Sequence, residues 1–431
     1  MSTQTATPTY QALHTTLGSI FTLDRERIDL EPHTGSAAHI ITREFSSTNW
    51  RVHPPESEEN TNPEFRRLVG AYIERYPYSE RNFFGKLQPS DRDVPENLRF
   101  RYPVFIPRHT RQSGPGGGDG GRFAGAIVLL HGLNEKSWLK YLPWALRLAE
   151  ETGRPVILFP IAFHMNRAPA AWSHPREMLG VSRERRRIFP GVEKSTFVNA
   201  ALSHRIQFAP HRFLTSGLQS YYDITDLVRH IRSGSDTLFS HGARVDIFGY
   251  SIGATLAELL LMSDPAGLFA DSRAFLFCGG SVMDRTNPVS KAIMDGRAHR
   301  GLVGFLGQLV SEARHALPRG IAVLKAGLWE VEIARSLLFV EKLRNVRERA
   351  MRAVGDRIAA LAMLRDRVFP AAGLEDSWKA ADGSKLMNIA TADPEFDYAH
   401  EQPLPVGSSA PGAVDRFFEE MISRAGAHLR A

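Results

Sequence analysis

Short apolar runs alternate with amphipathic stretches along most of the chain. Residues 124–132 and 155–163 are almost continuously apolar, as strands covered on both faces of a sheet are. Between them, residues 136–152 carry apolar side chains at helical spacing and stop at Gly153. A strand, a helix and a second strand at this spacing form a crossover unit, so the pattern predicts an α/β protein with a parallel sheet.

The same alternation continues to the end of the chain, with two interruptions. Residues 164–217 are rich in His, Arg, Pro and Trp, and residues 282–355 are mostly helical in pattern, with Pro318 dividing two apolar stripes. Such stripes suit simple core packing, but next to a sheet they also suit a helical lid over a site, which is the interpretation we favour. The other elements expected are helices at 218–231, 371–379 and 414–428 and strands at 272–281, 358–364 and 385–390.

The pattern is weaker before residue 124. Residues 38–45 alternate like an edge strand, residues 62–75 have an amphipathic helical pattern, and residues 98–107 have the composition of a second strand. The glycine-rich stretch 114–121 predicts a flexible tether. We therefore expect four parts: an N-terminal region (1–124), a first core part that contains the 164–217 insertion (125–281), a helical lid (282–355) and a second core part (356–431).

The clearest local signal lies around Ser251. Val245, Ile247 and Phe248 suit a buried strand, whereas residues 255–262 are strong helix formers. Between them stands Gly-Tyr-Ser-Ile-Gly, and a serine in a sharp strand-to-helix turn presents its hydroxyl clear of the sheet. The alternative is a serine in an ordinary glycine-flanked loop. The strand before it and the helix after it favour a nucleophile elbow.

A serine nucleophile needs a base, and the base needs a carboxylate that orients it. In a parallel sheet these groups come from loops at the carboxyl ends of strands. Asp366 follows the 358–364 strand and His400 lies beyond the 385–390 strand, which gives the order Ser, Asp, His. Asp284 is an alternative acid and His428 an alternative base, and Asp366 also suits an ordinary surface turn.

These motifs resemble those of the α/β-hydrolase superfamily over residues 125–281 and 356–430. The resemblance rests on the elbow and on three loops: His-Gly-Leu-Asn at 131–134, Asp-Arg-Val-Phe-Pro at 366–370, and Tyr-Ala-His-Glu at 398–401. It implies a mostly parallel eight-stranded sheet with helices on both faces and a lid inserted after the sixth strand. It also implies an oxyanion hole made by the backbone N–H groups of Leu133 and Ile252. His131, before this turn, is expected to be structural.

Composition and charge exclude several function classes. The chain has 431 residues, of which 43% are hydrophobic and 23% charged, as in a large globular protein. The formal charge of +6 includes basic runs at 183–187 and 344–349. Glutamates interrupt both runs, so we interpret them as solvated helix faces and expect no nucleic-acid partner. The single cysteine, Cys278, lies in an apolar strand pattern and cannot form an intrachain disulfide.

The sequence also gives expectations for the cellular location and for cofactors. No apolar run is long enough to span a bilayer and the first residues carry no secretory signal, so we expect a cytoplasmic protein without membrane insertion. The 164–217 insertion contains four histidines without tight ligand spacing, which we interpret as scattered surface or loop side chains: His164, His174, His204 and His211. We therefore expect neither a metal nor a cofactor.

The predicted activity is hydrolysis of a carboxylic ester, with an apolar acyl group or an aromatic ester as the small-molecule substrate. Ser251 would attack the carbonyl, His400 would move the proton and Asp366 would orient the imidazole. A thioesterase, an amidase or an acyltransferase would use the same site. The rival classes are a non-catalytic binding protein with this fold and a basic protein that associates with membranes or nucleic acids.

Overall fold

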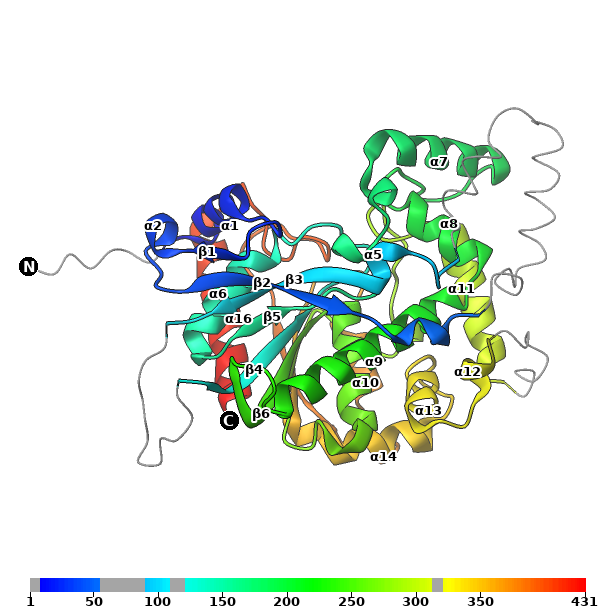
Figure 1. Ribbon diagram of the computed structural model, residues 1–431. Helices are drawn as coiled ribbons and strands as arrows, with labels where there is room; N and C mark the ends of the chain where they lie inside the picture. Colours follow the sequence, from blue (N-terminus) through cyan, green and yellow to red (C-terminus); the bar gives the residue numbers. More distant parts are fainter. Residues whose placement is uncertain (1–7, 55–89, 109–120, 312–320) are drawn as a thin grey trace, which may run out of the picture.

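The computed structural model describes residues 8–54, 90–108, 121–311 and 321–431. The predicted helix at 62–75 and the tether up to residue 120 lie outside these residues. Within them, nine strands form a single sheet in the order β1-β2-β3-β5-β4-β6-β7-β8-β9 (Figure 1). The strands are β1 (Arg27–Asp29), β2 (His39–Ser46), β3 (Arg99–Ile106), β4 (Phe123–Leu130), β5 (Val156–Leu158), β6 (Phe239–Tyr250), β7 (Ala274–Phe277), β8 (Ile358–Met363) and β9 (Asn388–Ala392).

Most of the sheet is parallel. Strands β5, β4, β6, β7, β8 and β9 are parallel neighbours, whereas β1, β2 and β3 pair in antiparallel fashion at one edge. The expected eight strands become nine because the short β1 pairs with β2. For the same reason residues 38–45 are not an edge strand, since β2 has a neighbour on each side. The parallel sheet with its serine elbow confirms the resemblance to the α/β-hydrolase superfamily.

Helices cover both faces of the sheet (Figure 1). Successive side chains of a strand point to opposite faces, and β4 follows this rule: Val128 packs in one apolar cluster with Leu260, and Leu129 in another with Trp144. One face carries α9 (Arg212–Arg232), α10 (Ile252–Ser263) and α14 (Arg344–Val354), and the other carries α1 (Tyr10–Ile20), α6 (Tyr141–Thr152) and α16 (Pro411–Arg430). Three further helices are short: α2 (Glu31–Thr34), α5 (Pro95–Leu98) and α15 (Ala371–Ser377).

Two predicted boundaries are wrong for reasons that the structure makes plain. Strand β5 has three residues, not the nine of the apolar run 155–163, because Pro160 lacks the N–H group that a central strand needs. The helix expected to begin at residue 218 begins at Arg212. The apolar stripe within 321–354 does not form one helix, since Leu343 adopts a left-handed conformation (φ 51°) just before α14.

Two segments, 164–217 and 282–355, follow the carboxyl ends of β5 and β7, and we call them the roof segments; α14, in the second, packs on one face of the sheet. The first contains α7 (Pro175–Ile188) and α8 (Ala200–Phe208). The second contains α11 (Gly296–Leu309), α12 (Ala322–Lys325) and α13 (Trp329–Ser336), besides α14. Helix α11 packs against α8, so the two segments are joined although they are far apart in sequence (Figure 1).

A buried ion pair strengthens this joint. The Arg185 guanidinium in α7 donates from Nε and Nη2 to Asp295 Oδ2, at 2.9 and 2.6 Å, and both side chains are fully buried. Asp295 is also the N-cap of α11, because its Oδ1 accepts the N–H of Ala298 at 2.9 Å. One carboxylate therefore begins a helix in the second roof segment and holds a helix of the first.

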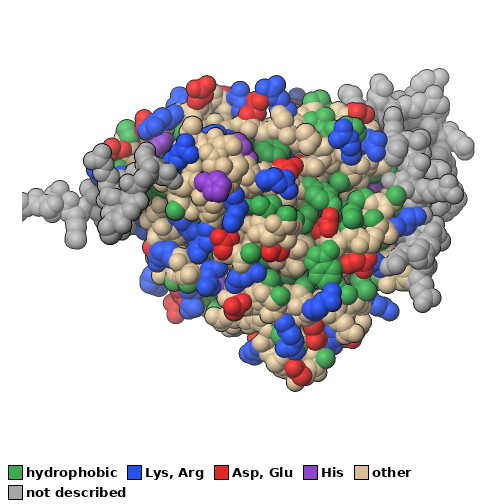
Figure 2. Space-filling model, turned by 60° about the horizontal axis from the view of Figure 1, so that its bottom comes forward, with side chains coloured by type: hydrophobic (Ala, Val, Ile, Leu, Met, Phe, Trp, Pro, Cys, Tyr) green, Lys and Arg blue, Asp and Glu red, His purple; other side chains and the backbone are tan. Residues whose placement is uncertain are grey.

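The basic runs are not solvated helix faces throughout. Arg185 and Arg347 are buried, and Arg347 donates to the backbone carbonyls of Ser336 and Val340. On the face shown in Figure 2, basic and acidic side chains are interspersed. In the described part of the chain, no helix combines the length and the apolar character that crossing a bilayer requires.

Three of the four histidines of the first roof segment are also buried, which corrects their interpretation as surface or loop side chains. These are His164, His204 and His211, whereas His174 is exposed. Among the described residues, no group of three or more His, Cys, Asp or Glu side chains is arranged to hold a metal ion.

Candidate active site

Ser251 stands at the sharp turn between β6 and α10. Its backbone has φ 57° and ψ −123°, a strained conformation for a residue with a side chain. The flanking glycines are required by close packing: a Cβ on Gly249 would lie 2.6 Å from Ala254 Cα, and a Cβ on Gly253 would lie 2.5 Å from the Leu130 carbonyl oxygen. This is the geometry of a nucleophile elbow.

The structure brings Ser251, His400 and Asp366 together. Ser251 Oγ lies 2.8 Å from His400 Nε2, and His400 Nδ1 lies 2.7 Å from Asp366 Oδ2. Because a carboxylate oxygen faces Nδ1, that nitrogen carries the proton, and Nε2 is left to accept the proton of the serine hydroxyl. The other carboxylate oxygen, Asp366 Oδ1, accepts the N–H groups of Val368 and Phe369 at 2.8 and 2.9 Å.

The imidazole of His400 is held between two aromatic rings. Its centroid lies 5.5 Å from that of Tyr250 and 5.4 Å from that of Phe369, with interplanar angles of 15° and 22°. The Tyr250 hydroxyl also donates to the backbone carbonyl of His400. His400 is 5% exposed and Ser251 is 2% exposed, so both side chains are shielded from bulk water.

The alternative acid and base lie elsewhere. Asp284 Oδ1 accepts the N–H of Val340 at 3.2 Å and Oδ2 pairs with Arg285. His428 Nε2 lies 3.1 Å from the carbonyl oxygen of Arg357, at the end of α16. Within the described residues, neither side chain contacts Ser251 or His400. The Asp366 side chain is buried and hydrogen-bonded, which is not the environment of an ordinary surface-turn residue.

Cys278 lies directly after β7, not within a strand, and is buried beside Asp366. Burial, together with the negative charge of Asp366, raises the pKa of its thiol well above the usual value. The thiol therefore stays protonated beside the carboxylate.

The backbone groups expected to form the oxyanion hole are free to do so. Among the described residues, no acceptor is found for the N–H groups of Leu133 and Ile252. His131 fixes the loop before Leu133: its Nδ1 donates to the Gly132 carbonyl at 2.8 Å, and its Nε2 accepts the N–H of Ile161 at 3.0 Å. Burial lowers the pKa of His131 well below the usual value, so the ring is neutral and makes both bonds.

A chain of polar contacts connects this loop to the loop of His400. The Gly132 N–H donates to the Tyr141 hydroxyl at 3.0 Å, and that hydroxyl donates to Glu135 Oε1 at 3.0 Å. Glu135 pairs with Lys140, whose ammonium also donates to the Glu401 carbonyl at 3.1 Å. Residues 131–135 and 398–401 are thus held in a fixed relation. Composition and spacing alone did not reveal these contacts.

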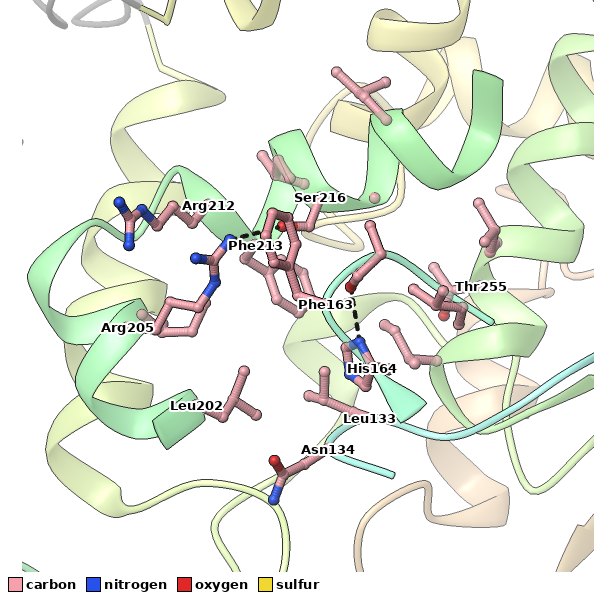
Figure 3. A pocket seen from close by; sticks show the side chains of 18 of the residues that line it. Leu133, Asn134, Phe163, His164, Leu202, Arg205, Arg212, Phe213, Ser216 and Thr255 are labelled. Carbon is pink, nitrogen blue, oxygen red and sulfur yellow. Dashed lines mark hydrogen bonds between the residues drawn. The ribbon is translucent and has the colours of Figure 1, made fainter. Parts of the chain in front are cut away.

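A cavity of about 130 Å³ lies next to Ile252, the residue after Ser251, and is lined by residues of both roof segments. Figure 3 shows part of this lining. Leu133 and Ile252 line the cavity, together with largely apolar side chains from both roof segments. Its polar side chains include His164, Arg205, Arg212 and Thr255, which Figure 3 labels, and Lys136. A second cavity of about 220 Å³ shares four lining residues with the first: Leu133, Phe213, Met283 and Leu338.

The chain is similar in structure to several solved hydrolases at low sequence identity. Against the Pyrococcus horikoshii acylaminoacyl peptidase, the identity is 12% and the TM-score 0.38, covering 77% of this chain and 40% of the peptidase. Against an esterase of Pyrococcus furiosus, the identity is 12% and the TM-score 0.37, covering 77% and 87%. Against a thermostable esterase of Pseudomonas putida, the identity is 10% and the TM-score 0.40, covering 85% of this chain and 98% of the esterase. This chain therefore spans less than half the length of the peptidase.

No curated protein matches the chain in sequence. Residues 10–430 match a family described as "Family of unknown function (DUF6051)". The match begins in α1 and ends at the last residue of α16, so it includes the whole sheet, the elbow and both roof segments. The chain belongs to the DUF6051 family.

Proposed function

We propose that this protein is a serine hydrolase that cleaves carboxylic esters through an acyl-enzyme. The observation that carries the proposal is the continuous line of hydrogen bonds from Ser251 Oγ through His400 to Asp366, at 2.8 and 2.7 Å, at the tip of a nucleophile elbow. A binding protein does not need a strained serine backed by a buried imidazole and carboxylate.

The chemistry follows from these positions. Ser251 Oγ attacks the ester carbonyl carbon while His400 Nε2 takes the hydroxyl proton. The carbonyl oxygen becomes an oxyanion that the N–H groups of Leu133 and Ile252 stabilise. When the intermediate collapses, the carbon–oxygen bond to the alcohol breaks and His400 returns the proton to the departing oxygen. A water molecule, deprotonated by His400, then releases the acid from the serine.

The apolar lining of the cavity supports an acyl chain or an aromatic group as the part of the substrate that is bound there. The two roof segments would act as a lid, since both contribute to this lining and Ser251 is buried. The same groups would also serve a thioester, an amide or transfer of the acyl group to an acceptor other than water.

A fluorophosphonate probe, which phosphonylates an activated serine with loss of fluoride, tests the proposal. We expect wild-type protein to be labelled and Ser251→Ala to be unlabelled. Ser272→Ala is the matched control: Ser272 is buried too, but it precedes β7 at the opposite end of that strand. Absence of labelling in folded wild-type protein, together with no hydrolysis of p-nitrophenyl esters, would refute the enzyme and favour the binding protein.

A further inference from the structure

Building on the proposed esterase activity, we propose that the acyl part of the substrate carries a free carboxylate, which Lys136 binds with the help of the Trp172 indole N–H. Both residues line the cavity next to Ile252. The preferred substrates would thus be half-esters of dicarboxylic acids, not esters of simple fatty acids.

Lys136 is a cation without an acidic partner. Its Nζ donates to the carbonyl oxygens of Trp172 and Val198, at 2.9 and 2.8 Å, and in the described part of the chain no carboxylate lies within ion-pair distance of it. An ammonium group has three donors, so one remains for a ligand. Burial without a counter-charge lowers the pKa of Lys136 to about 8. Placing an ammonium group in a largely apolar cavity costs desolvation free energy, and an anionic ligand would offset that cost.

Other charges near the cavity already have partners. Glu135, next to Lys136 in sequence, pairs with Lys140 and accepts the Tyr141 hydroxyl, so it does not neutralise Lys136. Arg205 pairs with the buried carboxylate of Asp91, and Arg335 pairs with Glu332. Arg212, which also lines the cavity, lies 3.6 Å from the same Asp91 carboxylate. Of these cations, Lys136 is the one for which no carboxylate partner is found among the described residues.

Trp172 supplies a second, independent donor at the same place. Its side chain is 5% exposed, it lines the cavity, and its indole N–H is buried with no acceptor among the described residues. An indole N–H can only donate, so an oxygen with lone pairs is what it requires. Lys136 Nζ is bonded to the backbone carbonyl oxygen of this same residue, and both residues line the same cavity, so we propose that one carboxylate reaches both donors.

His164 contributes a hydrogen-bond acceptor, in contrast to the donors of Lys136 and Trp172. Its Nδ1 donates to the Ala162 carbonyl at 2.9 Å, which leaves Nε2 as a lone-pair acceptor that is buried with no partner in the described structure (Figure 3). Burial lowers the pKa of His164 to about 4, so the ring is neutral at neutral pH. It suits a hydroxyl or N–H group on the uncharged part of the acyl chain, and leaves the carboxylate to Lys136 and Trp172.

The acyl part is the one that this cavity fits. Leu133 and Ile252, whose backbone N–H groups we propose as the oxyanion hole, line the cavity. Lys136, which also lines it, is three residues after Leu133 in the same loop. The acyl group stays attached to Ser251 after the alcohol has left, so it benefits most from an enclosed, specific cavity.

The test compares p-nitrophenyl half-esters of dicarboxylic acids, from succinate to sebacate, with uncharged p-nitrophenyl esters of matched length. We expect the wild type to have the higher kcat/KM on the half-ester at the best length. Lys136→Met should lower that kcat/KM roughly tenfold to a hundredfold, as loss of a charge-assisted hydrogen bond does, and should change the uncharged ester less than about threefold. Lys136→Arg should retain part of the preference.

Two further measurements keep the proposal falsifiable if Lys136→Met does not fold. Trp172→Phe keeps an aromatic ring but removes the N–H donor, and should weaken the preference for the half-ester. In the wild type, the preference should decline above about pH 8, where Lys136 loses its charge. Wild-type kcat/KM that favours uncharged esters at every length, or equal losses on both substrates in Lys136→Met, would overturn the inference. Fluorophosphonate labelling of Ser251 would still succeed in that case, whereas failure of the proposed function abolishes it.

Discussion

The contact between Gly253 and the end of β4 provides a quantitative test of the elbow. In Gly253→Ala, the new Cβ would lie 2.5 Å from the Leu130 carbonyl oxygen, whereas ordinary contact begins at 3.4 Å. The two backbones must therefore separate by about 0.9 Å, the difference between these distances. Overpacking of this kind costs about 1–3 kcal/mol of folding stability.

The effect on activity should be larger than the effect on stability. Leu130 leads directly into the loop that ends at Leu133, so the displacement moves a proposed oxyanion donor away from Ser251. A misplacement of about 1 Å can lower turnover about a hundredfold. We therefore expect kcat/KM on a p-nitrophenyl ester, and the rate of fluorophosphonate labelling, to fall about a hundredfold while the protein remains folded.

Gly304→Ala is the matched control for this experiment. A Cβ at Gly304, on the exposed side of α11, meets no atom within 4 Å. The substitution should leave activity unchanged and raise stability by about 0.8–1 kcal/mol through helix propensity. Thermal unfolding and steady-state kinetics of the wild type, Gly253→Ala and Gly304→Ala measure these effects on stability and activity. If Gly253→Ala keeps wild-type kcat/KM, the register between the elbow and the oxyanion loop is not what limits turnover, and the reasoning fails.

Three further changes test other parts of the structure. Asp366→Asn should lower kcat by about 10⁴ without unfolding the protein, because the imidazole loses its orienting charge. Steady-state kinetics and a thermal melt measure the two effects, and near-normal turnover would contradict the prediction. Asp295→Ala should cost about 3–5 kcal/mol in urea unfolding because it leaves Arg185 buried and unpaired, and adding Arg185→Met should recover most of this loss. Burial raises the pKa of Glu258 well above the usual value, so the folded state holds a proton that the unfolded state releases, and stability falls as pH rises above about 4.5. Glu258→Gln should thus have a higher midpoint urea concentration of unfolding than the wild type at pH 8, and a similar midpoint at pH 4. The same difference in midpoint at both pH values would contradict the raised pKa of Glu258.

The local parts of the fold and the site could be predicted from sequence. The elbow follows from a few consecutive residues, and the placement of Asp366 and His400 follows from the rule that loops at the carboxyl ends of parallel strands meet. The structure brings these side chains within hydrogen-bond distance of each other and of Ser251. Their catalytic roles remain predictions.

What sequence patterns could not supply are the contacts between distant segments. The ninth strand depends on β1 pairing with β2, and three residues carry too little pattern to be recognised. The burial of His204 and Arg185 depends on which helices pack over them, whereas composition places such residues at the surface. Lys136 bonds the backbone carbonyl of Trp172 only because two loops fold together.

The carboxylate of Asp295, shared by α7 and α11, constrains how a substrate could reach Ser251. Neither roof segment can swing away alone without stripping Arg185 of its counter-ion in a dry interior, which is a steep energetic barrier. Opening would therefore be a concerted tilt of both segments, or passage between them with the joint intact. Arg185 and Asp295 are 110 positions apart in the sequence, yet the two roof segments would move as one rigid unit.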